Sequence, residues 1–196
     1  MPCISAVQKT LAHAPAADSV FTPDFFVPYE AAAQGALRLI ARARSELTAL
    51  EGGGVYAVTY RLKTPQSIRG KLMKKGLPPS AAAAGTALQD IAGLRVVLTS
   101  VGAVYRFAGL LTASSSAQTI GIDDYIASPK KSGYRSLHVL LNIPVTLDGE
   151  TMMVPAEIQL RTAAMDLWAN IEHSICYKPQ HGEMSSSSRL CLDSLP

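Results

Sequence analysis

An Asp-Gly pair stands between two long segments of strand-like sequence, and it constrains the fold more than any other feature of the chain. Residues 135–147 (RSLHVLLNIPVTL) and residues 151–162 (TMMVPAEIQLRT) are rich in β-branched and apolar side chains. Asp148-Gly149 between them is the strongest short-range signal for a tight hairpin turn. If these two residues alone form the turn, the numbers of any two opposing residues add up to 297. The two segments are therefore predicted to be paired antiparallel strands.

This register gathers polar side chains on one face of the hairpin. Side chains alternate between the two faces of a strand, so Glu157, Gln159 and Arg161 share one face at intervals of about 7 Å. The register also places His138 opposite Gln159, and the imidazole joins the row. Because unpaired buried charges are costly, a cluster of mixed charges favours a solvent-filled cleft over a packed core. The hairpin therefore predicts a functional site on this face.

The composition is that of one α/β domain. The 196 residues are 48% hydrophobic and 17% charged, and a chain of this size buries enough surface to fold without disulfides or a structural metal. Cys3, Cys176 and Cys191 lack the spacing of metal ligands, which favours reduced thiols and a cytoplasmic protein. We expect no membrane span and no signal peptide, since neither pattern occurs in the sequence.

The charges are distributed unevenly, although the net charge is only +3. No acidic residue occurs between Glu51 and Asp90. Six basic residues fall within fifteen positions of that interval: Arg61, Lys63, Arg69, Lys71, Lys74 and Lys75. A solvated surface normally mixes both signs, so this block indicates an anionic partner. The alternative is a basic surface strip without a specific ligand.

The first half of the chain predicts one long helix, a strand and a short helix. The long helix runs from about Tyr29 to the glycines at 52–54, with Leu50 in its apolar stripe. A strand follows at 55–62. The short helix begins after Thr64 as its N-cap, with Pro65 in its first turn.

The second half predicts further strands and helices in alternation. Residues 77–87 (LPPSAAAAGTA) are expected to form a flexible connector. The remaining elements are a strand entered at Asp90, a helix capped by Ser100, a brief strand before Tyr125, the hairpin, and a helix from Thr162 to Pro179.

The short helix after residue 64 carries the pattern of an anion site. Ser67, Lys71 and Lys75 follow one another at intervals of four residues on one helix face, which begins at the free N–H groups of the helix N-terminus. Such a site suits a polyphosphate, although the P-loop signature is absent. Arg61 and Arg95 lie on predicted strands nearby, and two guanidinium planes can hold a nucleobase between them. The alternative is an ordinary surface arginine, which is the more frequent case for any single arginine.

Two carboxylates and an aromatic ring complete the predicted cleft. Asp90 and Glu157 lie on neighbouring strands and could hold Mg²⁺, which takes one or two carboxylates together with substrate phosphates. The alternative is that each carboxylate pairs with an arginine. Tyr134, with Lys130 and His138 around it, favours a stacking platform for a second base over a packed strand residue. Two base sites, phosphate-binding cations and one metal site describe a transferase that acts between two nucleotides.

Four segments together resemble a known family. YRLKTPQSIRGKL, DIAGLRVVL, DYIASPKKSGYRSLHVLL and AEIQLRTAAMDLWANIEHSICYK are similar to motifs of the RelA/SpoT-type nucleotide pyrophosphokinase domain, and most of all to the stand-alone small alarmone synthetases. The resemblance extends over about residues 29–178. It implies a nucleotidyltransferase-like fold, α/β with α+β character, in which helices flank a mixed β-sheet of about five strands. It also implies Mg²⁺-dependent transfer of pyrophosphate from ATP to the ribose 3′-OH of GDP or GTP, and of GMP in some members.

The resemblance assigns roles to individual positions. It implies that Arg61 and Arg95 hold the ATP adenine, while Lys63, Ser67 and Lys71 hold its phosphates. Catalysis and Mg²⁺ binding would belong to Asp90 and Glu157, with Glu157 drawing the proton from the 3′-OH. The implied acceptor-binding residues are Lys130, Tyr134, His138, Gln159 and Arg161. The domain would span residues 25–180, between a poorly ordered tail at 1–24 and a loosely ordered tail at 181–196.

The sequence also departs from the family pattern. None of the four histidines precedes an aspartate, so the His-Asp pair of the family's hydrolase domain is missing and we expect synthesis without hydrolysis. The segment GIDD at 121–124 matches neither the E-x-D-D nor the R-x-K-D form of the long enzymes. The C-terminal helices that form tetramers in the better-known small synthetases are not recognisable after Lys178. This leaves a homo-oligomer open.

Two other functions are compatible with these residues. A toxic member of the same superfamily would transfer pyrophosphate to adenine nucleotides or to the tRNA 3′ end, since a stacking ring tolerates any base. A non-catalytic nucleic-acid-binding module would use only the basic block at 61–75 and would show a steep salt dependence. Nucleic-acid binding is not our expectation. The leading prediction has ATP and GDP or GTP as substrates, and no membrane partner.

Overall fold

The computed structural model describes residues 8–9 and 20–176, and its centre is a mixed β-sheet. The strands follow the spatial order β1-β2-β3-β6-β5-β4. Their bounds are β1 Gln8–Lys9, β2 Val55–Leu62, β3 Ala92–Leu98, β4 Gln118–Asp124, β5 Leu137–Leu147 and β6 Glu150–Thr162. Strands β1 and β2 are parallel, as are β3 and β6, whereas the other neighbours are antiparallel. The predicted sheet of about five strands is confirmed, with the two-residue β1 added at one edge.

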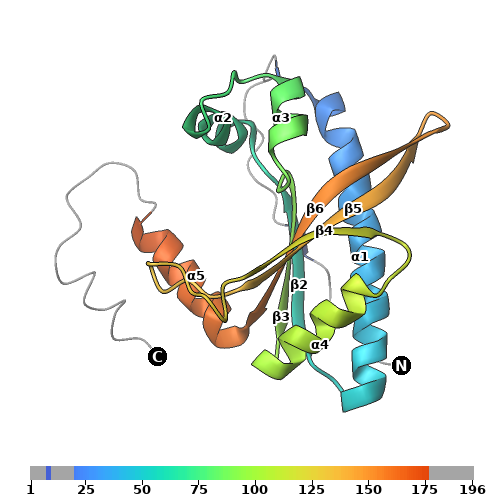
Figure 1. Ribbon diagram of the computed structural model, residues 1–196, viewed down its shortest axis with the longest axis vertical. Helices are drawn as coiled ribbons and strands as arrows, with labels where there is room; N and C mark the ends of the chain where they lie inside the picture. The colour runs from blue at the N-terminus through green and yellow to red at the C-terminus, as the bar shows by residue number, and fades with distance from the viewer. Residues whose placement is uncertain (1–7, 10–19, 177–196) are drawn as a thin grey trace.

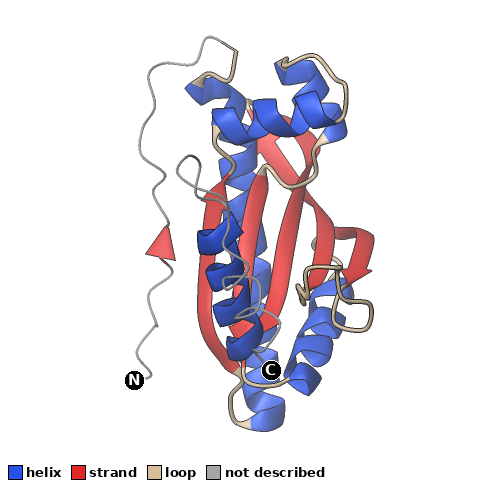
Figure 2. Ribbon diagram, turned by 90° about the vertical axis from the view of Figure 1, so that its left-hand side faces the viewer, coloured by secondary structure: helices blue, strands red, loops and turns tan. Residues whose placement is uncertain are grey.

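Helices cover both faces of this sheet. Their bounds are α1 Pro23–Glu51, α2 Pro65–Lys74, α3 Ala81–Ala87, α4 Val101–Thr112 and α5 Ala163–Cys176. Helices α1 and α4 pack on one face against β3, β5 and β6, whereas α5 packs on the opposite face against β3 and β6 (Figures 1 and 2). Helices α2 and α3 contact each other near the entrance of β3. Within the described part of the chain, no helix is long and apolar enough to cross a membrane.

The core lies between the sheet and α1 with α4. In β3 and β6 the buried positions alternate with partly exposed ones, and Leu94, Val96, Ile158 and Leu160 are almost fully buried. Each such aliphatic side chain contributes about 1.5–3 kcal/mol by leaving water. The residues between them, such as Arg95, therefore face the side of α5. This alternation separates the hydrophobic core from the polar face.

The hairpin forms as the sequence predicts. Asp148 has φ 51° and Gly149 has φ 85°, the left-handed conformation that a two-residue turn needs at both positions. The register pairs His138 with Gln159 along strands that run without a shift. Side chains 138, 157 and 159 consequently lie on the face away from α1.

Three local predictions differ from the structure. Helix α1 begins at Pro23 instead of Tyr29, because the aromatic residues after Thr22 pack against the core and extend the helix into the predicted tail. Leu50 is 71% exposed and lies outside the apolar stripe. The expected connector contains α3, whose Ser80 accepts a hydrogen bond from the N–H of Ala83. A run of alanines, the best helix former, outweighs the neighbouring prolines.

The predicted caps are confirmed where they can be compared. Thr64 Oγ1 accepts a hydrogen bond from the N–H of Ser67, and Thr162 Oγ1 accepts one from the N–H of Met165. The last described residue of α5 is Cys176, so its predicted end at Pro179 lies outside the described residues. The predicted tail at 181–196 lies outside them as well.

Candidate functional site

A row of polar side chains crosses four strands on the face of the sheet that α1 and α4 leave uncovered. Arg95 pairs with Gln159, Gln159 with His138, and His138 with Asp123. Directly paired residues point to the same face of a sheet. Residues from β3, β6, β5 and β4 therefore meet in one line, and the predicted hairpin register accounts for two of them, Gln159 and His138.

Asp90, just before β3, is held by two lysines. Its Oδ2 accepts hydrogen bonds from Lys63 Nζ at 2.7 Å and from Lys71 Nζ at 2.8 Å. Burial raises the pKa of Asp90, but these hydrogen bonds and positive charges outweigh it and hold the pKa below its ordinary value. The other oxygen, Oδ1, is buried without a hydrogen-bond partner. One carboxylate oxygen thus binds two cations while the second is free for a further one.

Glu157, on β6, is the second carboxylate of the site. Its Oε1 lies 3.1 Å from His138 Nδ1, and its Oε2 accepts a hydrogen bond of 2.6 Å from Gln159 Nε2. Burial raises the pKa of Glu157, whereas the hydrogen bonds from His138 and Gln159 lower it, and the net pKa lies below its ordinary value. The negative charge of Asp90 opposes this shift, as expected for two carboxylates that share one site.

These contacts close into a ring of side chains. Tyr134 Oη lies 2.8 Å from His138 Nε2, and Arg161 Nη2 donates both to Tyr134 Oη at 2.7 Å and to Gln159 Oε1 at 2.9 Å. An arginine can only donate, so Tyr134 Oη accepts from Arg161 and has its own hydrogen for His138 Nε2. His138 then carries its proton on Nδ1 and donates it to Glu157. Every bond of the ring has a donor and an acceptor, which fixes the orientation of all five side chains.

The loop between β4 and β5 presents the aromatic part of the site. Gly133 has φ 84°, and a Cβ there would lie 3.3 Å from the Trp168 ring, so a larger residue would disturb this turn. Lys130 Nζ lies 4.3 Å from the centre of the Tyr125 ring and 5.0 Å from that of Tyr134. The two tyrosine rings meet edge to face at 6.1 Å. The predicted platform therefore consists of two aromatic rings and one lysine.

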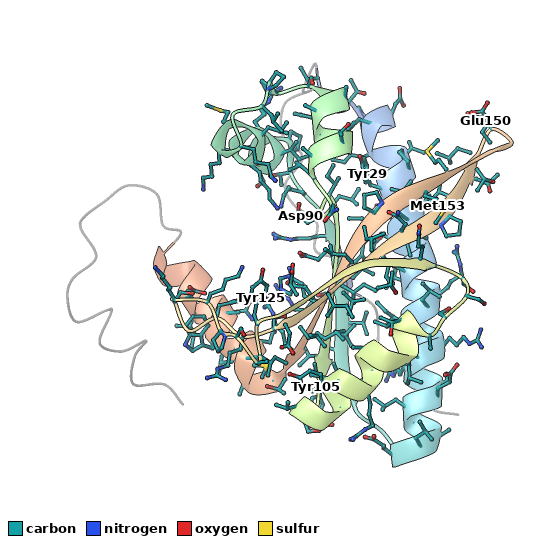
Figure 3. All side chains as sticks on the ribbon, in the orientation of Figure 1. Tyr29, Asp90, Tyr105, Tyr125, Glu150 and Met153 are labelled. Carbon is teal, nitrogen blue, oxygen red and sulfur yellow. The ribbon has the colours of Figure 1, made fainter. Side chains whose placement is uncertain are left out.

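Asp124 anchors the start of this loop. Its Oδ1 accepts hydrogen bonds from the N–H groups of Ile126 and Ala127, both at 2.9 Å, and Oδ2 accepts one from Tyr105 Oη at 3.0 Å. Burial raises the pKa of Asp124, but these hydrogen bonds lower it by more than burial raises it, so the net pKa lies below its ordinary value. Such a bonded aspartate turn holds the loop at the end of β4. Asp90 and Tyr125 lie on the same side of the sheet, away from α1 (Figure 3).

Two cavities open on either side of the carboxylates. The first, of about 170 Å³, is lined by Thr59, Tyr60, Arg61, Lys63, Asp90, Gly93, Leu94, Arg95, Glu157 and Gln159. The second, of about 400 Å³, is lined by Lys71, Lys75, Ala87, Gln89, Asp90, Asp123, Tyr125, Lys130, Tyr134, His138, Leu140, Glu157 and Gln159. Asp90, Glu157 and Gln159 belong to both. Two adjoining cavities with a shared carboxylate wall can hold two ligands whose ends meet there.

The sequence of this site is that of a known family. Residues 60–182 match the region found in RelA and SpoT proteins. The chain belongs to the RelA/SpoT family. The matched range begins within β2 and includes every residue that lines the two cavities except Thr59.

Curated relatives from Bacillus subtilis (strain 168) have similar sequences. The chain is 40% identical to the GTP pyrophosphokinase YwaC over 118 residues, which are 60% of this chain and 56% of that protein. It is 40% identical to the GTP pyrophosphokinase YjbM over 122 residues, which are 62% of this chain and 56% of that protein. The chain thus spans about half the length of the curated relatives it matches.

Solved structures of family members have the same fold. The small alarmone synthetase 1 of B. subtilis bound to its product pppGpp superposes with a TM-score of 0.74 at 34% identity, covering 86% of each chain. The same synthetase bound to AMPCPP gives 0.69 at 30% identity, covering 87% of this chain and 85% of that one. A GTP pyrophosphokinase family protein from Streptococcus pneumoniae gives 0.76 at 35% identity, with 87% and 83% covered.

Most of the sequence-predicted residues are brought together, with two exceptions. Ser67 is exposed, bonds with Thr64 and lines neither cavity. Arg161 is 4% exposed and lies beneath the site, where it supports Tyr134 and Gln159. The sequence analysis missed Asp123 and Tyr125. Asp123 pairs with His138, and Tyr125 follows directly after the strand that contains Asp123, so both line the cavity of His138. It also missed Gln89 and Asp166 of α5, whereas Lys75, expected on the same helix face as Lys71, does line the larger cavity.

The residues present fit a magnesium ion. In the part of the chain that the structure describes, no group of three or more histidine, cysteine, aspartate or glutamate residues could enclose a metal. Mg²⁺ does not need such a cage, because it keeps several waters and binds one or two carboxylates with substrate phosphates. Asp90 Oδ1 is buried without a hydrogen-bond partner, so it is available as a ligand. Glu157 lines the same two cavities as Asp90 and offers the second carboxylate.

Proposed function

We propose that the protein is a GTP pyrophosphokinase that transfers the pyrophosphate group of ATP to the ribose 3′-OH of GDP or GTP. The observation that carries this proposal is the pair of cavities with a common wall of two carboxylates. A transfer between two nucleotides needs both reactants held end to end at one charged centre, because positioning supplies much of the rate. The curated relatives with 40% identity are named GTP pyrophosphokinases, which supports the same assignment.

The cavity lined by Arg61 and Arg95 is the proposed ATP site. Two guanidinium groups on neighbouring strands can stack on the adenine. Lys63 in this cavity and Lys71 in the adjoining one both converge on Asp90, where they would bind the phosphates as point charges. Ser67 lines neither cavity and its N–H group is bonded to Thr64, so it is not part of the proposed phosphate site. The likeness to a synthetase structure bound to AMPCPP supports a donor nucleotide in this family's fold.

The larger cavity is the proposed acceptor site. Tyr134 would stack on the guanine, and its ring is held by Arg161 and His138. Lys130 would bind acceptor phosphates, and Gln159 would orient Glu157 between the two nucleotides. His138 lines the same cavity, but both of its ring nitrogens are engaged by Tyr134 and Glu157, so its proposed role is to hold these two side chains beside the acceptor. The likeness to a synthetase structure bound to its product pppGpp supports an acceptor guanosine nucleotide in the same fold.

At the shared wall, Glu157 is the proposed base. Its lowered pKa keeps it ionised at neutral pH, so it can take the proton of the 3′-OH when that oxygen attacks the β-phosphorus of ATP. AMP leaves as the bond to the β-phosphorus breaks. Asp90 and Glu157 would hold Mg²⁺, which neutralises phosphate charge when bound. The ring of hydrogen bonds keeps Glu157 oriented throughout, and the lysines hold the phosphates in line.

Product analysis tests this proposal. Purified protein receives γ-labelled ATP and one acceptor at a time: GDP, GTP, ADP, ATP alone or tRNA. We expect the label on the guanosine nucleotides, AMP in equal amount, and no transfer when a chelator removes Mg²⁺. Label mainly on adenine nucleotides or the tRNA 3′ end would reassign the acceptor, whereas no AMP formation with any acceptor would refute the transferase.

A further inference from the structure

One acidic residue of α5 contacts arginines from both halves of the site. Asp166 Oδ1 accepts a hydrogen bond from Arg161 Nη1 at 3.0 Å and lies 3.2 Å from Arg95 Nη1. Asn170, one turn later, donates to Asp166 Oδ2 at 3.3 Å and accepts from Arg95 Nη1 at 3.4 Å. The side chain of Asp166 is 19% exposed. A single carboxylate oxygen therefore holds two guanidinium groups.

Both arginines depend on this carboxylate electrostatically. Burial lowers the pKa of Arg95, the charge of Arg161 lowers it further, and Asp166 acts in the opposite direction. Arg95 Nε and Arg161 Nε are buried without hydrogen-bond partners, so neither guanidinium is fully solvated or fully paired. Two like charges can remain this close only while Asp166 neutralises them.

The two arginines lead to different cavities. Arg95 lines the smaller cavity, the proposed ATP site. Arg161 lines neither cavity but donates to Tyr134 Oη, and its guanidinium carbon lies 5.1 Å from the centre of the Tyr134 ring in the larger one. Trp168, on the same helix as Asp166, seats the loop of Tyr134 at Gly133. Helix α5 thus touches both nucleotide sites through side chains that carry no assigned role.

We propose that Asp166 is a positioning residue that couples the binding of the two nucleotides, an inference that rests on the proposed function. A base stacked on Arg95 fixes that guanidinium against Asp166. The fixed Asp166 then holds Arg161, and Arg161 holds the Tyr134 ring in its stacking position. The first nucleotide to bind meets the entropic cost of ordering these side chains. The second nucleotide does not meet this cost again, so it binds more tightly and binding is cooperative. By linkage, each nucleotide must raise the affinity of the other by the same factor.

Binding titrations measure this factor without turnover. The full 196-residue protein is titrated with GDP in a calorimeter, first without a second nucleotide and then with saturating AMPCPP and Mg²⁺. We expect AMPCPP to raise the affinity for GDP about fivefold or more, within the usual range for coupled sites. Asp166→Asn, which keeps the shape but loses the charge, should bring this factor close to one. The matched control Asp148→Asn, in the hairpin turn, should keep the wild-type factor.

A second variant guards against misfolding of the first. Asn170 is exposed, so Asn170→Ala should fold normally, and it should lower the coupling factor partly by loosening Asp166. A wild-type factor of one, or an unchanged factor in both Asp166→Asn and Asn170→Ala, would overturn the proposal while leaving the transferase in place. Weaker binding of each nucleotide with the same factor would show a structural role only and would also overturn it. Binding of neither nucleotide by the wild type would overturn the proposed function and this inference together.

Discussion

We expect the replacement of Glu157 by glutamine to lower the turnover rate far more than it lowers the stability of the fold. Glu157 accepts a hydrogen bond on each oxygen, from His138 and from Gln159. The new amide offers one acceptor and one donor, so one of these contacts becomes donor against donor. An unsatisfied buried group costs about 1–3 kcal/mol of stability. For a chain of this length about 1 kcal/mol lowers Tm by roughly 2–4 °C, so we expect a folded protein with a Tm up to about 12 °C lower.

The effect on activity should be much larger than that on folding. The amide cannot accept the 3′-OH proton, and it removes one of the two negative charges from the wall that the cavities share. Loss of a preorganised group of this kind costs about 10²–10³ in kcat, or about 2.7–4 kcal/mol of transition-state stabilisation. The measurement is AMP release under saturating ATP and GDP at a temperature well below both Tm values, together with thermal unfolding followed by circular dichroism.

Glu150→Gln provides the matched control for this variant. Glu150 lies on the same strand, at the tip of the hairpin and far from Asp90 (Figure 3). It should leave both kcat and Tm close to the wild-type values. Near-normal turnover of Glu157→Gln would show that Glu157 is not at the reaction centre. If the loss of kcat in Glu157→Gln is fully explained by the fraction of protein that is unfolded at the assay temperature, the catalytic role of Glu157 is refuted as well.

Three further predictions concern the two nucleotides, the product and the pH dependence. Arg61→Ala should raise KM for ATP, and Tyr134→Ala should raise KM for the acceptor, because a lost stacking contact is worth about 1–3 kcal/mol; titration of each substrate with the other saturating checks this, and equal damage to both substrates in both variants would contradict the two-site assignment. Added ppGpp with Mn²⁺ should release no pyrophosphate above a heat-inactivated control, and release would disprove the expectation of synthesis without hydrolysis. The pKa values of Asp90 and Glu157 lie below their ordinary values of 3.8 and 4.5, so the stability they provide is complete above about pH 4.5 and is lost as the pH falls through the lowered values. Tm measured from pH 7 to pH 3 should therefore fall less steeply in Asp90→Asn than in the wild type, and parallel curves would contradict the assignment of these shifts to the native contacts.

The sequence predicted the hairpin half of the site well, for a geometric reason. Asp148-Gly149 fixes the turn, the turn fixes the register, and the two-residue period of a strand then decides which side chains share a face. The proximity of His138 to Glu157 and Gln159 follows from these rules alone. The caps at Thr64 and Thr162 were equally local, because each bonds to an N–H group three residues later.

Tertiary contacts that depend on helix placement were beyond the same reasoning. Asp166 meets Arg95 only because α5 folds back over β3 and β6, and no spacing in the sequence encodes that distance. The burial of Arg161 had the same origin, since an arginine on the polar face of a strand is expected to reach solvent. Helix α3 was missed because its alanines follow two prolines and include a glycine, which are signals of a loop.

In the proposed reaction, one pair of carboxylates serves two nucleotides during a pyrophosphate transfer. Its most direct test is a competition assay with γ-labelled ATP, equimolar GDP and ADP, Mg²⁺ and the purified protein, with products separated and counted. We expect the label mainly as a 3′-pyrophosphate on the guanosine nucleotide, with one AMP formed for each transfer, and we expect Glu157→Gln to lower both signals by about 10²–10³. Dominant labelling of ADP would contradict the assigned acceptor, and label released as free phosphate without AMP would contradict the transfer itself.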